Sequence, residues 1–288
     1  MPTYRLTLEY EGTRYRGWQE QQNARTVAGE LRAAVEKVAG SVAEIGGSGR
    51  TDAGVHAMHQ TAHVRVGRTM PPEALRSAIS DQLPPDIHIL SAALAPDRFH
   101  ARHAALSRSY LYQVSRRRTA FAKRLVWWVK SPLDVARMRA AAELIPGRHD
   151  FALFCERPQD QVSTIVVVEG SEIAEADDLV LFRFVASHFL WRMVRRLVGT
   201  LVRVGVGKLT VEEFAAMIGG TVAIQGDEGP AKWTAPPSGL FLERVLYPGD
   251  PPLPAIAPAV PVAREEAQAP EGLPARQTQG LRFPQRRG

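Results

Sequence analysis

Apolar and polar residues alternate along several short segments in the first third of the chain. Such alternation predicts β-strands with one buried face, because successive side chains of a strand point to opposite sides. Apolar residues recur at helical spacing from Thr26 to Gly40, and a second helix is expected from Pro71 to about Leu83. The expected strands cover residues 3–10, 42–45, 60–66 and 87–94. This order of strand, helix, strand, strand, helix, strand is typical of a ferredoxin-like unit.

The same order of elements returns in the next part of the chain, although the sequence itself does not repeat. The elements expected there are strands at 107–115, 162–173, 179–186 and 239–247, and helices at 134–144, 189–204 and 210–218. The pattern therefore predicts an α+β fold of two ferredoxin-like (RRM-like) halves. We expect their sheets to join into one antiparallel sheet with helices on one face. The halves are placed at residues 1–103 and 104–247.

The composition of the chain changes at Pro248. Residues 248–288 hold nine of the 21 prolines and a single aromatic residue, Phe283. A segment with so few large apolar side chains does not bury enough surface to offset the entropy lost on ordering. We therefore expect residues 248–288 to form a disordered, proline-rich tail.

The 288 residues carry a formal net charge of +6, with an isoelectric point of about 9.8. A basic balance favours an anionic partner, of which nucleic acid is the commonest. No apolar run reaches the roughly 20 residues of a membrane span, and the first residues lack the apolar core of a secretory signal. The single cysteine, Cys155, excludes an internal disulfide and suggests a reducing compartment. These features predict a cytoplasmic protein.

A glycine-rich stretch, residues 46–57, separates two of the expected strands. Its sequence is GGSGRTDAGVHA, and its four glycines permit backbone conformations and close approaches that a side chain would block. Asp52 lies at the apex, two residues after Arg50, where a large ligand can reach it. The simplest interpretation is that Asp52 forms an Asx-turn with its own backbone. The alternative is a catalytic carboxylate on a rigid loop, kept ionised by a nearby cation.

The segment GRTDAGVHA, residues 49–57, resembles the signature of the tRNA pseudouridine synthases of the TruA family. The pattern YxGxxYxGWQxQ, which starts at Tyr10 and continues into the loop at 11–25, also resembles that family. The resemblance implies that Asp52 is a catalytic nucleophile. It implies isomerisation of uridine to pseudouridine at positions 38, 39 and 40 in the anticodon stem-loop of tRNA, by a homodimer without cofactor or metal. We expect the RNA cleft on the sheet face opposite the helices, with Asp52 at its floor.

The helix expected at 189–204 holds four arginines in different surroundings. Its apolar residues form one broad face when they are placed at about 100° per residue. Arg195 lies at the flank of this face, from which its guanidinium can reach along a cleft. Its surroundings match the family pattern FxxxMVRxxxGxL, and the resemblance implies that Arg195 pairs with Asp52. The arginines expected on the opposite, solvated side are Arg192, Arg196 and Arg203.

Tyr110 and Tyr112 share one face of the strand expected at 107–115. The residues alone favour two half-buried core tyrosines. The segment that starts at Arg108 matches the family pattern RxYxY, and the resemblance implies that Tyr110 stacks on the target base. One departure from the family is Ser163, where many members carry an arginine. The arginines expected to contact the RNA are Arg14, Arg16, Arg50, Arg98 and Arg102.

Other patterns are weaker candidates for chemistry. His56, His59 and His63 do not all share a strand face and lack a carboxylate that would complete a ligand set, so we expect no metal site. The segment GGSGRT lacks the lysine and the glycine spacing of a nucleotide-binding loop. Two alternative functions stay open. One is a catalytically silent RNA-binding module, and the other is a glycoside hydrolase, which would need a second carboxylate paired with Asp52.

Overall fold

The computed structural model describes residues 1–156, 163–221 and 229–262. The first half of the chain has the predicted order of elements. α1 begins where the Thr26 hydroxyl accepts the Gly29 N–H at 3.2 Å, and it ends at Gly40, whose φ is 79°. The elements are β1 (Thr3–Tyr10), η1 (Gly12–Arg14), α1 (Val27–Ala39), β2 (Val42–Gly47), β3 (His56–Val66), α2 (Pro72–Ser80) and β4 (Ile87–Ala95).

The second half contains the predicted strands and helices, together with two short strands that the alternation does not predict, β6 and β7. The elements up to β8 are β5 (Ser107–Ser115), β6 (Trp127–Trp128), α3 (Val135–Ala142), β7 (Gly147–Asp150), η2 (Ala152–Phe154) and β8 (Ile165–Ala176). They are followed by β9 (Leu179–Ala186), α4 (Met193–Gly205), α5 (Val211–Ile218), η3 (Pro237–Gly239) and β10 (Leu240–Leu246).

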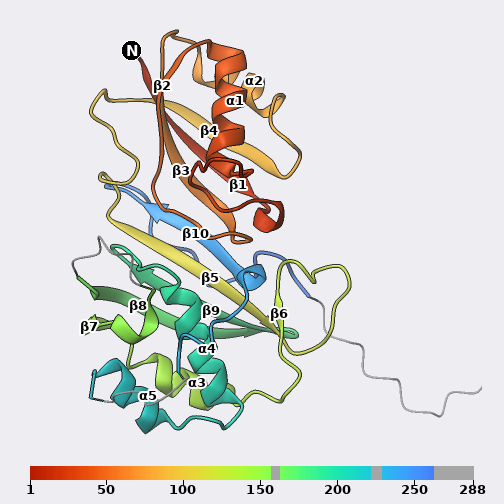
Figure 1. The fold of residues 1–288 in the computed structure, drawn as a ribbon, viewed down its shortest axis with the longest axis vertical. Coiled ribbons are helices and arrows are strands. Elements are labelled where there is room, and N and C mark those ends of the chain that lie inside the picture. The colour runs from red at the N-terminus through yellow and green to blue at the C-terminus, as the bar shows by residue number, and fades with distance from the viewer. Residues whose placement is uncertain (157–162, 222–228, 263–288) are drawn as a thin grey trace, which may run out of the picture.

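The strands of the described residues form one sheet in the order β4-β1-β3-β10-β5-β9-β8-β7, with β2 also paired to β3 and β6 to β5. The last strand, β10, joins the two halves in the middle of this sheet (Figure 1). It runs antiparallel to β5 but parallel to β3, where Phe241 faces His56 and Leu242 faces Ala57. The expectation of an antiparallel sheet is therefore wrong at the junction, because β3 and β5 run in opposite directions and β10 pairs with both.

One large core lies between the sheet and the helices. Alternate residues of β1 and β9, such as Leu6 and Phe182, pack in the same cluster as Leu31 of α1 and Leu197 of α4. Figure 1 shows α1 and α2 against one end of the sheet and α3, α4 and α5 against the other. The helices of both halves thus cover the same face of the sheet. The opposite face carries a smaller cluster around Leu111, Leu181, Phe241 and Val262.

Part of the predicted tail packs on this second face. Val262 is 4% exposed, and Ile256 and Ala259 pack against the same cluster. The Ala259 N–H donates to Gln113 Oε1 at 2.7 Å, so the segment is also tied to β5 by a hydrogen bond. The prediction of a disordered tail from Pro248 onward is therefore wrong for residues 249–262, because a few well-placed apolar residues are enough to bind an existing apolar surface. Residues 263–288 of the predicted tail lie outside the described residues.

The start and the surroundings of α4 also differ from the sequence prediction. The helix begins at Met193 rather than at residue 189, because Arg192 has a φ of 62° and leaves the helical region. Arg196 is buried and donates to the Cys155 carbonyl, and the Arg203 guanidinium lies 5.0 Å above the Trp233 ring. The predicted solvated side of the helix is therefore wrong for Arg196, because neighbouring loops cover it.

Candidate active site

The loop between β2 and β3 carries Asp52, and a second loop braces it. The Trp18 N–H donates to the Thr51 carbonyl at 3.1 Å, and the Gly54 N–H donates to the Tyr15 carbonyl at 3.2 Å. Gly17 has a φ of 95°, and a Cβ at this position would lie 2.4 Å from the Thr51 oxygen. Only glycine therefore allows the two loops to approach this closely, and the approach fixes the backbone on both sides of Asp52.

Buried polar side chains hold the first part of the same loop. The Ser48 hydroxyl donates to Gln60 Oε1 at 2.8 Å, and Gln60 Nε2 returns a bond to the Gly49 carbonyl at 2.9 Å. The hydroxyls of Tyr10 and Thr51 are 2.8 Å apart and hydrogen-bonded. Since these groups are buried and paired, the loop is a rigid support.

Arg195 of α4 lies against the Asp52 carboxylate, as the resemblance implied. Its Nη1 is 3.4 Å from Asp52 Oδ2, while its Nε donates to the Ala235 carbonyl at 2.7 Å. The segment that contains Ala235 runs tightly along α4, because a Cβ at Gly199 would lie 1.7 Å from the Trp233 oxygen. The guanidinium is thus anchored by the backbone and makes one long contact with Asp52, whose side chain stays 23% exposed.

Burial and charge act on Asp52 in opposite directions. Burial raises the pKa of the Asp52 carboxyl above its ordinary value, whereas Arg195, Arg192 and a hydrogen bond from the Trp191 side chain act to lower that pKa. Burial also lowers the pKa of Arg195. Both shifts disfavour the charged forms, so the fold holds this pair together at a cost in folding free energy.

Tyr110 and Tyr112 both lie in the core, but their hydroxyls differ. The Tyr112 hydroxyl donates to the Pro236 carbonyl at 2.8 Å. The Tyr110 hydroxyl makes no hydrogen bond within the described residues, and its ring meets Phe189 edge-on at 5.0 Å. Burial, and to a smaller extent the Asp52 charge, raises the pKa of Tyr110. Tyr110 therefore keeps a free hydroxyl close to Asp52.

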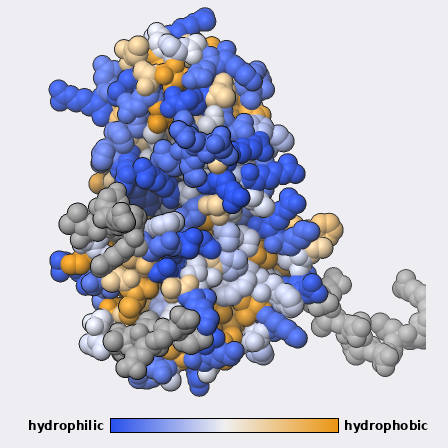
Figure 2. All heavy atoms as spheres, in the orientation of Figure 1, coloured by the Kyte–Doolittle hydropathy of each residue, from blue (hydrophilic) through white to orange (hydrophobic). Residues whose placement is uncertain are grey.

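The site lies on the helix-covered face of the sheet. Arg195 belongs to a helix on that face, and Tyr110 belongs to the large core there. The expectation that Asp52 would lie on the face opposite the helices is therefore wrong: the site opens between the helices of the two halves. Hydrophilic side chains dominate the middle of the face that Figure 2 presents, between α1 and α4.

The predicted RNA-contacting arginines are exposed, but they have different neighbours. Arg14 and Arg16 line a depression of about 390 Å³ that also includes Ala53 and Gly54, next to Asp52. The remaining three are Arg50, Arg98 and Arg102, all exposed in loops. The loop at 98–102 is close to the Asp52 loop, because one buried guanidinium bonds to both of them.

That guanidinium belongs to Arg108, the first residue of the RxYxY pattern. Its Nη2 donates to the Ser48 carbonyl at 2.9 Å and to the Arg102 carbonyl at 2.6 Å, and its Nη1 donates to the Ser187 carbonyl at 2.7 Å. It thus ties β5 to the loop of Asp52 and to the turn that leads into α4. No periodicity in the sequence distinguishes such an arginine from one on the surface.

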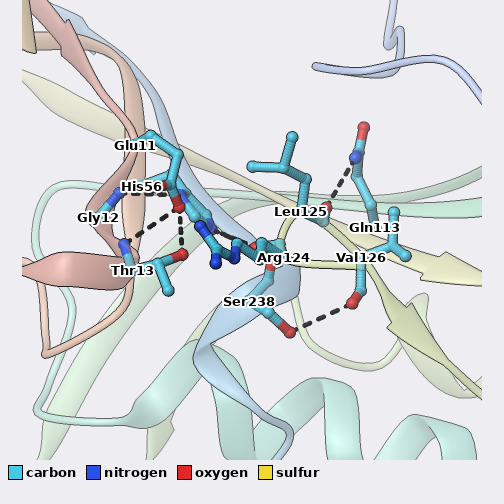
Figure 3. A network of polar contacts seen from close by, with 9 residues as sticks. All are labelled: Glu11, Gly12, Thr13, His56, Gln113, Arg124, Leu125, Val126 and Ser238. Carbon is cyan, nitrogen blue, oxygen red and sulfur yellow. Dashed lines mark hydrogen bonds and ion pairs between the residues drawn. The ribbon is translucent and has the colours of Figure 1, made fainter. Parts of the chain in front are cut away.

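His56 is a second tie that sequence reasoning missed (Figure 3). Its Nδ1 accepts the Gly12 N–H at 2.9 Å, so its Nε2 carries the proton and donates toward the Arg124 and Ser238 carbonyls at 3.0 and 3.2 Å. Its ring stacks on Phe241 at 4.8 Å. Burial lowers the pKa of His56, which favours this neutral form. His56 therefore joins η1, which contains Gly12 and Arg14, to the second half of the chain.

A group of potential metal ligands lies elsewhere, formed by Glu44, His63 and His100. The Ala101 N–H donates to His63 Nδ1 at 3.1 Å, so the neutral imidazole carries its proton on Nε2, the atom 3.3 Å from Glu44. A protonated ring nitrogen has no lone pair for a metal ion. The group is arranged as a histidine–carboxylate contact, and His56 and His59 are occupied by other partners.

Comparison with known proteins assigns the chain to a family. The family model for tRNA pseudouridine synthase matches residues 7–103 and 140–248, so the chain belongs to this family. It is therefore an isomerase that converts uridine in tRNA to pseudouridine. None of the helices in the described part of the chain is long and apolar enough to cross a membrane.

Curated relatives are similar over most of the chain. The tRNA pseudouridine synthase A of Allorhizobium ampelinum is 40% identical over 255 residues, covering 87% of this chain and 96% of the relative. That of Syntrophotalea carbinolica is 41% identical over 249 residues, covering 86% and 97%. Among solved structures, the archaeal box H/ACA sRNP Nop10–Cbf5 complex aligns with 69% of this chain and 44% of its own at 13% identity. The TM-score of this alignment is 0.34.

Proposed function

We propose that Asp52 is the nucleophile that converts uridine to pseudouridine at positions 38, 39 and 40 in the anticodon stem-loop of tRNA. The reaction breaks the bond between N1 and C1′, turns the base, and forms a bond between C5 and C1′. C5 loses a proton and N1 gains one, so no cofactor is needed. The observation that carries the proposal is the contact between Arg195 Nη1 and Asp52 Oδ2 at 3.4 Å, on a partly exposed carboxylate.

Asp52 acts on the ribose or on the base, and both routes require an ionised oxygen that the substrate can reach. Arg195 supports ionisation because its charge opposes the rise in the pKa of Asp52 caused by burial. A single long contact leaves carboxylate lone pairs available for attack. The target uridine must leave its stack to reach this depth. Tyr110, with its free hydroxyl near Asp52, is the residue that we assign to stack on the extruded base.

Exposed cations at the rim of the site are assigned to the RNA backbone. Arg14 and Arg16 line the depression beside the Asp52 loop, and Arg108 links the Arg102 loop to the same place. Phosphate contacts of this kind position an RNA without reading its sequence. The remaining rim residues are Arg50 and Arg98. Ser163, also exposed, stands where many relatives carry an arginine, so we expect no cationic RNA contact there.

The two halves have the same strand order, which supports our division at residues 1–103 and 104–247. The first half reads β4-β1-β3-β2, and the second reads β10-β5-β9-β8. Each is the order of a ferredoxin-like unit, with its first strand in the middle. We propose that the RNA enters between these two units. We also propose that the chain is one protomer of a cytoplasmic homodimer, and this proposal rests on the family resemblance alone.

Pseudouridine formation on defined RNA tests the proposal. The recombinant protein should convert uridines at positions 38–40 of an unmodified tRNA in buffer that contains a chelator and no nucleotide, as measured by chemical mapping of pseudouridine. A matched tRNA with cytidine at those positions controls for activity elsewhere. Binding of the tRNA without any product would favour the catalytically silent RNA-binding module instead. Product at other uridines only would refute the assignment of positions.

A further inference from the structure

Trp191, a residue to which the catalytic proposal gives no part, lies in the turn between β9 and α4. Its neighbours Leu190 and Met193 are buried, but Trp191 keeps 43% of its surface exposed. Leaving a large aromatic ring in water forgoes hydrophobic stabilisation that burial would provide. An exposed aromatic side chain beside an RNA site is typical of a contact that stacks on a base.

The turn holds the Trp191 ring in a defined place. Arg192 has a φ of 62°, a conformation that costs a residue with a side chain roughly 1–3 kcal/mol. Glu156 compensates, since its carboxylate pairs with Arg192 at 2.8 Å and its N–H donates to the Trp191 carbonyl at 3.0 Å. The Arg192 guanidinium lies 5.1 Å from the centre of the Trp191 ring, within the range of a cation–π contact. The ring is therefore preorganised before RNA binds.

The same turn borders the catalytic residues. Phe189 packs on Tyr110, and Arg195, four residues after Trp191, contacts Asp52. The Trp191 side chain is also one of the groups that act to lower the pKa of the Asp52 carboxyl. The indole therefore lies at the mouth of the site with much of its surface open to solvent.

We propose that Trp191 is a tRNA-binding residue that stacks on an unpaired nucleobase of the tRNA, next to the uridine that enters the Asp52 site. The inference rests on the proposed role of Asp52. When the target uridine leaves its stack, the adjacent base loses a stacking partner. An indole at the mouth of the site replaces that partner.

The first experiment measures RNA affinity in an Asp52→Asn background, where no turnover disturbs the equilibrium. The probe is an anticodon stem-loop with one uridine among positions 38–40. Trp191→Ala should raise the Kd by about 5- to 150-fold, as expected for one lost base–aromatic stack. Trp191→Phe should stay within a few-fold of the parent, because it keeps an aromatic face.

The chain offers a matched control in Trp128. Trp128 is 38% exposed and lies under Arg118 at 5.1 Å, but it belongs to β6 and is not among the residues that act on Asp52. Trp128→Ala should leave the Kd within about two-fold of the parent, well below the effect of one lost stack. Equal losses from Trp128→Ala and Trp191→Ala would indicate a general effect of exposed aromatics and would overturn the proposal.

The second experiment removes the base instead of the ring. Stem-loops carry an abasic nucleotide at the 5′ or the 3′ neighbour of the target uridine, and each is titrated with the parent and with Trp191→Ala. At one of the two neighbours, the abasic nucleotide should raise the Kd of the parent protein as much as Trp191→Ala does. Combining that abasic nucleotide with Trp191→Ala should raise the Kd little further. Stacking would be refuted if the two changes multiplied their effects on the Kd at both neighbours. It would also be refuted by an unchanged Kd for Trp191→Ala. Because turnover plays no part, these results are independent of whether the wild-type protein forms pseudouridine.

Discussion

Two arginine–carboxylate pairs lie on opposite faces of the same sheet and differ in how fully they are bonded. Arg183 reaches Glu243 through two nitrogens, with Nε at 2.9 Å from Oε2, and the Ser109 hydroxyl donates to the same oxygen at 2.6 Å. Both side chains are less than 10% exposed. Arg195 meets Asp52 through one nitrogen at 3.4 Å, with both side chains partly exposed.

The difference separates a structural pair from a reactive one. Glu243 has a donor on each oxygen, so it has little capacity left for a substrate. Asp52 keeps free lone pairs, and its neighbours leave its pKa above the ordinary value. Burial disfavours the ionised form of Asp52, and the Arg195 charge compensates only partly, so this carboxylate is poised for chemistry. The fully bonded pair of Arg183 and Glu243 instead holds strands together. The same residue types thus serve two purposes, which the number of bonds distinguishes.

The largest expected effect follows from removing the reactive carboxylate. Asp52→Asn keeps the size and turn-forming tendency of the side chain but loses the nucleophilic oxygen. Because enzymes accelerate their reactions by at least about a millionfold, single-turnover pseudouridine formation should become undetectable while tRNA affinity stays within a few-fold. Substantial product from Asp52→Asn would remove Asp52 from the role of nucleophile.

Stability provides the control for that variant. The folded-state pKa of Asp52 is raised, so its ionised form destabilises the fold at neutral pH, and this penalty disappears as the pH falls below the ordinary value. Asp52→Asn should therefore melt no lower than the wild type at pH 7. A clear fall in Tm would mean that Asp52 supports the fold and that the lost activity has a structural cause.

The second prediction concerns the structural pair. Glu243→Gln leaves the buried Arg183 guanidinium with only the more distant Glu172 carboxylate, 3.5 Å from its Nη1, and breaking a buried pair costs about 3–5 kcal/mol. We expect this loss in denaturant unfolding, with activity per folded molecule nearly unchanged. A strong loss of turnover in fully folded Glu243→Gln would show that the two pairs are coupled across the sheet.

The sequence was sufficient where local pattern and motif determine the outcome. The alternation in β1, the caps of α1 and the glycines around Asp52 were predicted from neighbouring residues alone. The pairing of Asp52 with Arg195 needed the family resemblance, because 143 positions separate the two residues and no periodicity connects them.

The sequence was insufficient where distant segments supply the environment. Arg196 looked solvated on a helical projection, but the Cys155 carbonyl covers it. Arg192 made the helix begin at Met193, later than predicted, through one backbone angle. The parallel pairing of β10 with β3 and the packing of Ile256, Ala259 and Val262 depend on surfaces that exist only after the sheet forms. Tertiary contacts decided each of these points.

The third prediction uses the segment that covers the structural pair. The Pro254 carbonyl accepts from Arg183 Nη1 at 2.9 Å, and Val262 fills the apolar cluster behind β5. A chain that ends at residue 262 should match the Tm of the full chain. A chain that ends at residue 248 exposes this cluster and should lose about 2–4 kcal/mol, the scale of one or two large apolar side chains. Equal Tm values for both truncations would show that residues 249–262 add no stability.

The smallest expected effect separates what the charge of Arg195 contributes to catalysis from what the geometry of its guanidinium contributes. Arg195→Lys keeps the charge, but an ammonium group does not reproduce the fork that bonds the Ala235 carbonyl through Nε and reaches Asp52 through Nη1. We expect kcat to fall about 10- to 100-fold, since losing one positioned charged contact costs roughly 1.5–3 kcal/mol. A weaker cationic contact also lowers the pKa of Asp52 less, so the acidic limb of the kcat profile should move to higher pH. Measuring kcat against pH for the wild type and Arg195→Lys checks both points. A lower kcat with an unmoved acidic limb would leave Arg195 a geometric role only, and an unchanged kcat would remove it from the active site.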